Sequence, residues 1–283
     1  MKKLFFILSF ILTFNAFAEE QYPTSGNDCG DHCSWSLDNG VLTVTGYGDI
    51  KSYDRDCSNG CSNTAPWSGQ MPNITKIVIE NEANTEGFKN IGSHAFCDLY
   101  HVREVVLPEG LEKIGHGAFL ANFPLTKVNL PSSLTDIGGL AFDDTNLTNI
   151  TIPNQITEIK NCAFGNVNIT SIIIPENVTA ISPIAFTIST GTSDTPLETI
   201  YCPEHLLTQC QAAVAFRTNA GLTTEILPYQ KTQDGQIFYQ GKWYATANDI
   251  LKPNGHIKKR IYTIDEANKI SKPNGNTIKI KYR

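Results

Sequence analysis

The chain has 283 residues, of which 41% are hydrophobic and 18% are charged, a composition that is typical of a globular protein and excludes a largely disordered one. Lys and Arg number 22 against 28 Asp and Glu, so the formal net charge of −6 disfavours a nucleic-acid backbone as the main ligand. The positions of the eight Cys and six His residues must decide between disulfide bonds, metal binding and catalysis.

Residues 1–18 have the features of a secretory signal peptide. A basic pair at 2–3 precedes an apolar run at 4–14, and the small-residue site Ala-Phe-Ala follows at 16–18. The run is too short for a helix that crosses about 30 Å of hydrocarbon, and no later stretch is apolar enough. We therefore expect an exported protein that is secreted, held at the cell surface or kept in a periplasm, with no transmembrane segment.

Residues 19–73 are predicted to form an N-terminal β module that covers the first unit of a repeat domain. Residues 35–37 and 42–44 alternate apolar and polar side chains on either side of the turn Asp38-Asn39-Gly40, a pattern typical of a β-hairpin. Such a cap is needed because the first coil of a stack would otherwise expose its apolar side to water.

Four cysteines of this module lie in two C-x₃-C pairs, Cys29 with Cys33 and Cys57 with Cys61. An exported chain is usually oxidised, so we expect at least one disulfide bond here, although the sequence does not separate the three possible pairings. The alternative is tetrahedral zinc ligation by four thiolates, but a spacing of two residues between ligands is commoner in zinc sites than three. No metal site is therefore predicted.

The dipeptide Ala-Phe recurs with a nearly constant spacing. It occurs at 95–96, 118–119, 141–142, 163–164 and 185–186, at intervals of 23, 23, 22 and 22 residues. Two markers keep the same phase: an isoleucine four residues before each Ala, and an apolar residue followed by Pro at 107–108, 130–131, 152–153 and 174–175. Such self-similarity at a fixed period indicates a solenoid of stacked repeats.

Residues 74–203 are predicted to form this repeat domain. Each unit has apolar residues in the pattern L-x-x-V-x-L-P, whose last two apolar positions share one face of a strand because side chains alternate along it. The following Pro ends the strand because it lacks an N–H group. Each unit should therefore contribute one short parallel strand, and the Phe rings should stack between successive coils.

This pattern is that of a leucine-rich-repeat solenoid, which belongs to the α/β horseshoe class with mostly parallel strands and little helix. The blocks LTKVNLPSSLTDIGGLAF and ITSIIIPENVTAISPIAF resemble the BspA-like leucine-rich repeats of bacterial and protist surface proteins. The upstream segment CGDHCSWSLDNGVLTVTGYGDI, followed by APW, is similar to the module that commonly precedes these repeats. The resemblance implies a rigid protein-recognition scaffold, with adhesion to host matrix proteins or other cells as the family's common role.

The outward-facing residues of the strands are the candidate ligand-binding surface on the concave face. Strand parity places them in two columns, Lys76, Glu104, Lys127, Asn149, Ser171 and Thr199, and Val78, Val106, Asn129, Thr151, Ile173 and Tyr201. Few of them are charged, so an anionic polymer is not the expected ligand of this face. Ile173 beside Tyr201 forms a candidate anchor pair of the kind that dominates protein interfaces.

Residues 204–231 are predicted to cap the other end. An amphipathic helix over 203–216 would turn Leu206, Leu207, Cys210 and Val214 to the last coil, and Cys202 and Cys210 are then plausible disulfide partners. Cys97 and Cys162 occupy different repeat phases and are expected to be buried and unpaired.

Catalysis finds little support in the sequence. His94 and His116 lie beside Ala-Phe pairs in neighbouring coils, but no Asp, Cys or Ser recurs with them at a spacing that builds a triad or a metal site. They are better explained as stacked turn residues. We expect no enzyme activity and no cofactor.

Residues 232–283 are predicted to form a small basic module. Residues 250–283 hold nine Lys or Arg against two acidic residues, a net charge of +7, whereas residues 19–249 hold 11 against 26, a net charge of −15. Segments 237–239 and 242–244 are predicted to form a hairpin. The candidate docking residues for an anionic envelope polymer are Lys258, Arg260, Lys279, Lys281 and Arg283. The alternatives are a solvated strand face and a basic tail that folds on the acidic solenoid.

The sequence as a whole therefore predicts an exported or surface protein-binding scaffold. A structural, envelope-associated module without a host ligand is the alternative, and an exported enzyme is the least favoured hypothesis.

Overall fold

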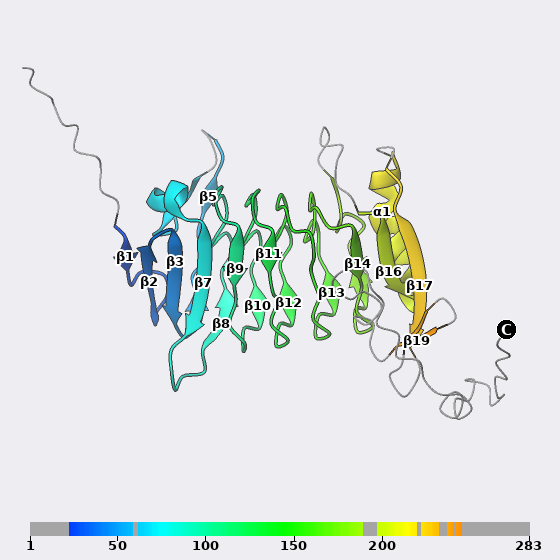
Figure 1. The fold of residues 1–283 in the computed structure, drawn as a ribbon, viewed down its shortest axis with the longest axis horizontal. Coiled ribbons are helices and arrows are strands. Elements are labelled where there is room, and N and C mark those ends of the chain that lie inside the picture. Colours follow the sequence, from blue (N-terminus) through cyan, green and yellow to red (C-terminus); the bar gives the residue numbers. More distant parts are fainter. Residues whose placement is uncertain are drawn as a thin grey trace, which may run out of the picture.

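The computed structural model describes residues 23–58, 62–188, 197–219, 222–231, 237–239 and 242–244. The predicted signal peptide at 1–18 and the predicted docking residues of the basic module lie outside the described residues. The described chain is a solenoid of stacked coils with an N-terminal β module at one end and a helix at the other (Figure 1). We number the coils by the residue that begins each front strand or segment: Lys76, Glu104, Lys127, Asn149, Ser171 and Thr199 for coils 1 to 6.

The predicted N-terminal hairpin is present. Strands β2 (Cys33–Asp38) and β3 (Val41–Gly46) pair antiparallel around Asn39 and Gly40, whose φ angles of 48° and 81° are the positive values that a two-residue hairpin turn requires. Strand β1 (Ser25–Gly26) pairs with β2, and β3 pairs in parallel with the first repeat strand, β7 (Lys76–Asn81). The hairpin thus extends the repeat sheet and covers its first edge. The module is completed by β4 (Gly48–Ile50), β5 (Arg55–Asp56), β6 (Ser62–Asn63) and the 3₁₀ helix η1 (Ser68–Asn73).

Two ladders of parallel strands run along the solenoid. The front ladder consists of β7, β9 (Glu104–Val106) and β11 (Lys127–Val128), and resumes with β14 (Ser171–Ile173) and β16 (Thr199–Pro203). The back ladder consists of β4, β8 (Phe88–Ile91), β10 (Lys113–Ile114) and β12 (Asp136–Ile137), and resumes with β13 (Glu158–Ile159) and β15 (Ala180–Ile181). Apolar side chains from both ladders fill the space between them.

The Ala-Phe turns form a third, uninterrupted ladder. In each of the first four coils the amide of the Phe donates to the carbonyl of the next coil's Ala, as Phe142 does to Ala163 at 3.1 Å. The Phe rings stack as predicted, and Trp67 of the N-terminal module continues the stack on Phe96. Successive ring centroids from Trp67 to Phe186 lie 4.9, 5.5, 5.4, 6.0 and 6.4 Å apart, so the coils separate slightly toward the C-terminus.

The prediction that each unit contributes a strand is wrong for coil 4, because residues 147–153 form no strand. The connector between the Phe and the next front segment has five residues at 97–101 and 120–124, but four at 143–146 and 165–168. One residue fewer shortens the reach of the chain by up to about 3.3 Å, so the segment that starts at Thr148 does not come into hydrogen-bond register with β11.

The back ladder is interrupted between the same coils, because β12 and β13 are not hydrogen-bonded neighbours. In coils 2 and 3 the residue after the back-strand isoleucine is Gly115 or Gly138, where a Cβ atom would lie 2.6 or 2.5 Å from the backbone of the preceding coil. Coil 4 has Lys160 at this position, but a Cβ alone does not open the ladder, because coil 5 has Ser182 there and β15 still pairs with β13. The Nζ atom of Lys160 bridges the gap to Asp136 Oδ1 at 2.6 Å.

The C-terminal end combines a helix with further strands. The 3₁₀ turn η2 (Glu204–Leu206) leads into α1 (Leu207–Asn219), which buries Cys210, Ala213 and Val214, whereas the predicted core residue Leu207 is only half-buried. Strand β17 (Glu225–Lys231) then pairs in parallel with β16. The predicted hairpin of β18 (Ile237–Tyr239) and β19 (Lys242–Tyr244) is present and pairs with β17.

The structure contains the disulfide bonds that are expected of an exported chain. Disulfide bonds join Cys29 to Cys33 and Cys202 to Cys210, and Cys57 is also disulfide-bonded. Cys61 lies outside the described residues. The two C-terminal partners were the pair expected from the sequence.

Among the cysteines that the structure describes, Cys97 and Cys162 are free, as expected. Cys97 is buried, and burial raises the pKa of its thiol to about 12. Cys162 is only half-buried, contrary to expectation, because it occupies the left-handed position at the outside of the turn before Ala163, with a φ of 50°.

Candidate functional site: the front face of the sheet

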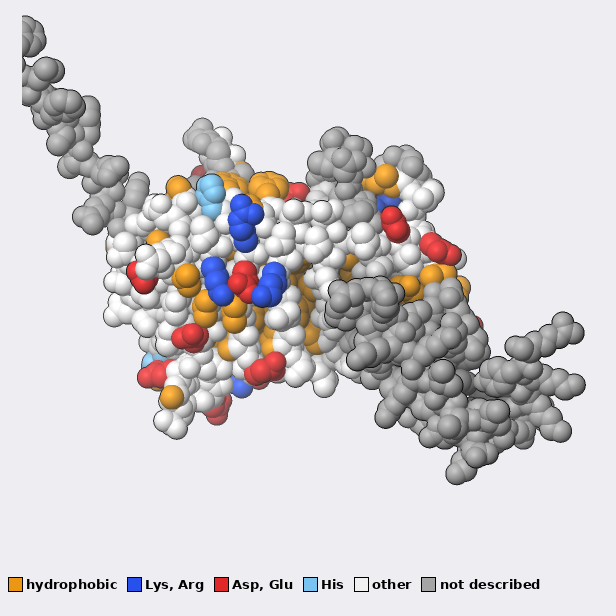
Figure 2. Space-filling model, viewed as in Figure 1, with side chains coloured by type: hydrophobic (Ala, Val, Ile, Leu, Met, Phe, Trp, Pro, Cys, Tyr) orange, Lys and Arg blue, Asp and Glu red, His pale blue; other side chains and the backbone are white. Residues whose placement is uncertain are grey.

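The two predicted columns of outward-facing residues lie on the front ladder and on the segment of coil 4 that interrupts it, and we call this surface the front face. In the first column, Lys76, Glu104 and Lys127 are in register on β7, β9 and β11. The Glu104 carboxylate accepts from Lys76 Nζ at 3.0 Å and from Lys127 Nζ at 2.5 Å. Both hydrogen bonds lower the pKa of Glu104, and the bond from Lys127 has the larger effect. Figure 2 shows basic and acidic side chains gathered over the N-terminal half of this face.

The second column begins with apolar side chains. Val106 is 39% exposed and Val78, in register with it on the neighbouring strand, is half-buried. Asn129 and Thr151 continue the column and are exposed. The described surface thus offers an apolar pair beside a row of charges, in an arrangement that backbone hydrogen bonds hold in place.

The predicted anchor pair at the C-terminal end is not an exposed pair. Ile173 is only 7% exposed, and its neighbours Ile172 and Ile174 are buried as well. Both sides of β14 are therefore covered, so the alternation of inward and outward residues that predicted an exposed Ile173 fails here. Tyr201, Ser171 and Thr199 are half-buried.

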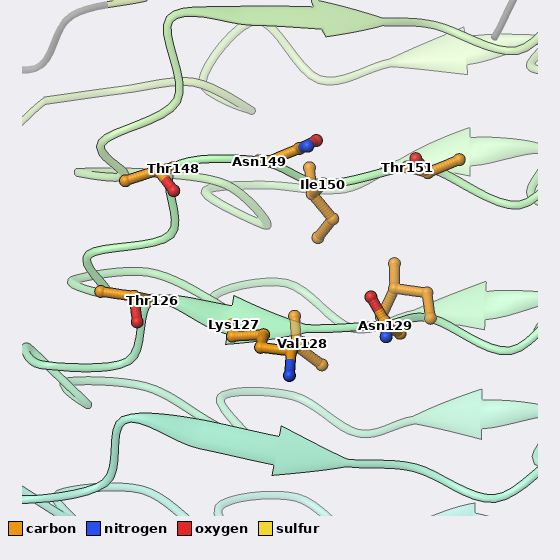
Figure 3. A pocket seen from close by; sticks show the side chains of 9 residues that line it. Thr126, Lys127, Val128, Asn129, Thr148, Asn149, Ile150 and Thr151 are labelled. Atoms are coloured by element: carbon orange, nitrogen blue, oxygen red, sulfur yellow. The ribbon is translucent and has the colours of Figure 1, made fainter. Parts of the chain in front are cut away.

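A hollow of about 420 Å³ opens in the front face between coils 3 and 4 (Figure 3). Its lining residues come from two segments, 126–130 and 148–151. Four predicted site residues, Lys127, Asn129, Asn149 and Thr151, are brought together here. The hollow lies where the front ladder is interrupted, and no backbone hydrogen bond joins the two lining segments, all of whose residues are described.

Most polar side chains of the hollow have no partner. The exposed side chains of Asn129, Asn149, Thr148 and Thr151 make no hydrogen bond within the described protein. Thr126 Oγ1 donates to the carbonyl of Arg103 in the preceding coil, and Lys127 is held by Glu104. Val128 and Ile150 are buried beneath these groups and provide an apolar floor.

Two exposed aromatic rings lie at the edge of the front face, in the five-residue connectors. Tyr100 is 39% exposed and Phe123 is 54% exposed, and the rings stack with centroids 6.0 Å apart. The four-residue connectors of the next two coils lack an aromatic residue, so the stack ends at Phe123. Sequence analysis missed this pair, although the change in repeat spacing from 23 to 22 residues was a visible signal.

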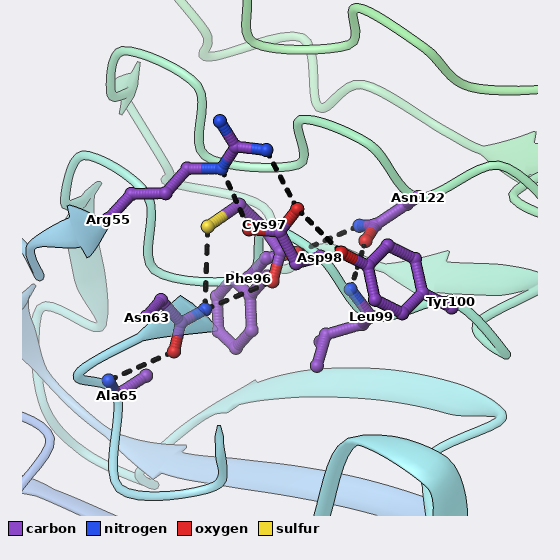
Figure 4. Close-up of polar contacts among 9 residues, drawn as sticks. All are labelled: Arg55, Asn63, Ala65, Phe96, Cys97, Asp98, Leu99, Tyr100 and Asn122. Carbon is purple, nitrogen blue, oxygen red and sulfur yellow. Dashed lines mark hydrogen bonds and ion pairs between the residues drawn. The ribbon is translucent and has the colours of Figure 1, made fainter. Parts of the chain in front are cut away.

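A buried polar network joins the N-terminal module to coil 1 (Figure 4). Arg55 makes a bidentate pair with the fully buried carboxylate of Asp98, through Nε at 2.7 Å and Nη2 at 2.9 Å. Burial alone would raise the pKa of Asp98, but the hydrogen bonds and charge of Arg55 outweigh it and hold that pKa below its ordinary value. Asn63 Nδ2 donates to the carbonyl of Cys97 at 3.0 Å. These contacts fix the register between the module and the solenoid.

A buried asparagine, Asn122, fixes the register between coils 1 and 2 in a similar way. Asn122 Nδ2 donates to the carbonyl of Phe96 at 2.9 Å, and Asn122 Oδ1 accepts from the amide of Leu99 at 2.8 Å. The side chain thus satisfies backbone groups of the connector that no ladder reaches. This polar pairing explains why an amide is tolerated in the core.

The two histidines that sequence analysis singled out do approach each other. The rings of His94 and His116 meet edge to face, with centroids 5.5 Å apart, and burial followed by the charge of His116 lowers the pKa of His94. No carboxylate or thiol joins them in a cluster, and no group of three or more His, Cys, Asp or Glu in the described residues could hold a metal ion. The pair is thus a contact between stacked turns.

Comparisons with known proteins agree with this architecture. Residues 69–193 match the family model described as the BspA type leucine rich repeat region, in six copies. A leucine-rich repeat protein from Eubacterium ventriosum is 21% identical with a TM-score of 0.52, over 77% of this chain and 49% of that one. The likeness shows the fold, and the chain spans about half the length of that protein.

Two further solved structures are more distant. A leucine-rich repeat protein from Bacteroides ovatus is 20% identical over 61% of this chain and 46% of that one, with a TM-score of 0.37. A leucine rich cell surface protein from Faecalibacterium prausnitzii is 18% identical over 77% and 61%, with a TM-score of 0.35. No curated protein matches the chain. Within the ranges that the structure describes, no helix is long and apolar enough to cross a membrane.

Proposed function

Because residues 69–193 are BspA-type leucine-rich repeats, we propose that the chain is an exported or cell-surface scaffold that binds another protein through the N-terminal half of its front face. The observation that supports this most directly is the exposed Val106 beside the fixed row of Lys76, Glu104 and Lys127. An apolar contact flanked by ordered charges is the composition of a typical protein interface, with a dry centre and a polar rim.

The rigidity of this face favours binding. Each of the charged side chains is held by a partner on the next strand, so little side-chain freedom is lost when a ligand arrives. The row carries two positive charges against one negative charge, and the nearby exposed Arg103 adds another. The favoured partner is therefore a protein surface with an apolar patch and an acidic border.

Export is supported by the disulfide bonds as well as by the sequence at 1–18. Cys29–Cys33 and Cys202–Cys210 are bonded, and structural disulfides persist in oxidising compartments. Adhesion to host matrix proteins is the specific role that the family resemblance suggests.

The test is a matched pair of substitutions in the full chain. Val106→Glu changes the front face, and Ile184→Glu changes an equally exposed apolar residue on an Ala-Phe turn, since the two side chains are 39% and 41% exposed. Both proteins are screened by surface plasmon resonance against immobilised extracellular matrix and cell-surface proteins.

We expect Val106→Glu to weaken binding at least about tenfold, as loss of an interface anchor does, and Ile184→Glu to leave it unchanged. Equal binding by both variants would contradict the proposed site. Retention of other copies of this chain alone would instead support the structural, envelope-associated alternative.

A further inference from the structure

The hollow between coils 3 and 4 has the size and the unmet hydrogen-bonding capacity of a ligand site. Its volume of about 420 Å³ falls within the range of small-molecule pockets, about 300–1,000 Å³. Two carboxamides, Asn129 and Asn149, and two hydroxyls, Thr148 and Thr151, line it without any partner of their own in the described chain. A ligand would therefore gain these hydrogen bonds without breaking any within the protein.

The chemistry of these groups selects for a neutral ligand rich in hydroxyl groups. Carboxamides and hydroxyls both donate and accept, which is the dual capacity that a sugar hydroxyl also has. The lining contains no carboxylate, and its one cation, Lys127, is already paired with Glu104 at 2.5 Å. Neither an anionic nor a cationic ligand finds an unpaired opposite charge in the lining.

An exposed aromatic residue lies in the connector that leads into the hollow. Phe123 precedes the lining residue Thr126 by three positions, so their Cα atoms are at most about 11 Å apart. One face of the ring stacks on Tyr100. No second aromatic ring of the described chain stacks on Phe123, and the shorter connector at 143–146 contains no aromatic residue. The C–H groups of a sugar ring pack on the face of an aromatic ring, because its π-electrons are negative and the C–H groups are weakly positive.

From these observations we infer that the hollow at 126–130 and 148–151, with Phe123 in the connector that leads into it, binds a neutral oligosaccharide. The hollow shares Lys127 with the charged row proposed for protein docking, but Val78 and Val106 do not line it and its ligand class differs, so the inference goes beyond the proposed function. The site arises from the repeat itself, because the shorter connector both opens the ladder and supplies no second aromatic ring to stack on Phe123.

An extended peptide is a less suitable occupant. A peptide strand pairs with a continuous row of unpaired backbone groups along a sheet edge. At the hollow the unpaired backbone groups lie on two short segments that face each other across it, and partnerless side chains lie on both of these segments. A compact ligand with hydroxyl groups on several sides can use them all at once.

The experiment screens the full chain on an array of immobilised neutral and anionic oligosaccharides, and then measures the best-bound neutral oligosaccharide by isothermal titration calorimetry. The variants are Asn129→Ala, Asn149→Ala and Phe123→Ala. The control is Asn154→Ala, which removes an exposed carboxamide from the same coil outside the hollow. Thermal unfolding of each variant establishes that it is folded.

We expect each of the three variants to weaken binding about tenfold, the effect of one lost hydrogen bond or stacking contact, and the control to bind like the original protein. Absence of any neutral oligosaccharide with a Kd below about 1 mM would overturn the inference. So would binding that survives the combined Asn129→Ala and Asn149→Ala change, binding confined to anionic sugars, or capture of peptides that the same oligosaccharides fail to displace.

Discussion

Removal of a central ring from the Phe stack should destabilise the whole solenoid. Phe142 is fully buried and has ring neighbours on both sides, Phe119 at 5.4 Å and Phe164 at 6.0 Å. Phe142→Ala leaves a cavity in a core that cannot collapse, because the backbone of the turn is tied to the coils on either side. Truncation of a buried Phe costs about 3–5 kcal/mol, and two stacking partners place this residue at the upper end, about 4–5 kcal/mol.

Two further substitutions calibrate that figure within the same molecule. Phe186 is 2% exposed but has one ring neighbour at the widest spacing, 6.4 Å, so Phe186→Ala should cost about 3 kcal/mol. Phe123 is 54% exposed and stacks only on Tyr100, so Phe123→Ala should cost about 1 kcal/mol or less. The free energy of unfolding of each variant is obtained from urea denaturation followed by circular dichroism.

The order of the three costs is the critical result. A cost below about 1 kcal/mol for Phe142→Ala would mean that the ring is not part of a packed stack, and the repeat register would be wrong. A larger cost for Phe123→Ala than for Phe142→Ala would refute the argument that burial, and not stacking alone, sets the magnitude.

Three other perturbations have defined outcomes. Arg55→Ala should lower the free energy of unfolding by about 3 kcal/mol at pH 7, because it leaves the buried Asp98 unpaired. Since Arg55 depresses the pKa of Asp98, the difference in stability between the two proteins should shrink as the pH falls through that pKa. A pH-independent difference in urea titrations would contradict this. Burial, and next the charge of its neighbour Asp144, raises the pKa of Asp143 to about 6, so the ionised carboxylate costs stability as the pH rises from 4 to 6. Asp143→Asn should therefore raise the free energy of unfolding at pH 7 by about 1–2 kcal/mol and have less effect at pH 4, and equal effects at both would be evidence against this. Replacement of both Cys202 and Cys210 by Ala should cost about 2–3 kcal/mol in thermal unfolding, since the bond closes a short loop, and an unchanged Tm would show that the bond is not formed in solution.

Much of the fold could be predicted because the position of a residue within the repeat determines whether its side chain is buried. Ile114, Val128 and Phe142 are buried where the period places them, and the family recognition and the solenoid are confirmed. The same argument could not place Trp67 on the Phe stack, because the N-terminal module has no repeat phase that assigns its side chains to positions.

The candidate site was only partly predictable. Alternation along a strand tells which side of the sheet a residue faces, and Lys127 and Asn149 are exposed as it predicts, although it predicted no hollow beside them. It does not tell whether that side is covered, and so it failed for Ile173. Nor does it tell whether two neighbouring coils are close enough to pair, because that distance depends on the length of the connector between them.

The three ladders also determine how the molecule responds to tension. Between coils 2 and 3 the front, back and turn ladders share a load applied along the long axis, whereas between coils 3 and 4 the backbone of the described residues is joined only by the turn bonds, such as Phe142 to Ala163. The force on each hydrogen bond is therefore greatest at that junction. A pull on the two ends would stretch the molecule there first, with the Phe stack and the side-chain contacts Lys160–Asp136 and Asn166–Asp143 as further resistance. The solenoid is accordingly a stiff rod with one compliant joint.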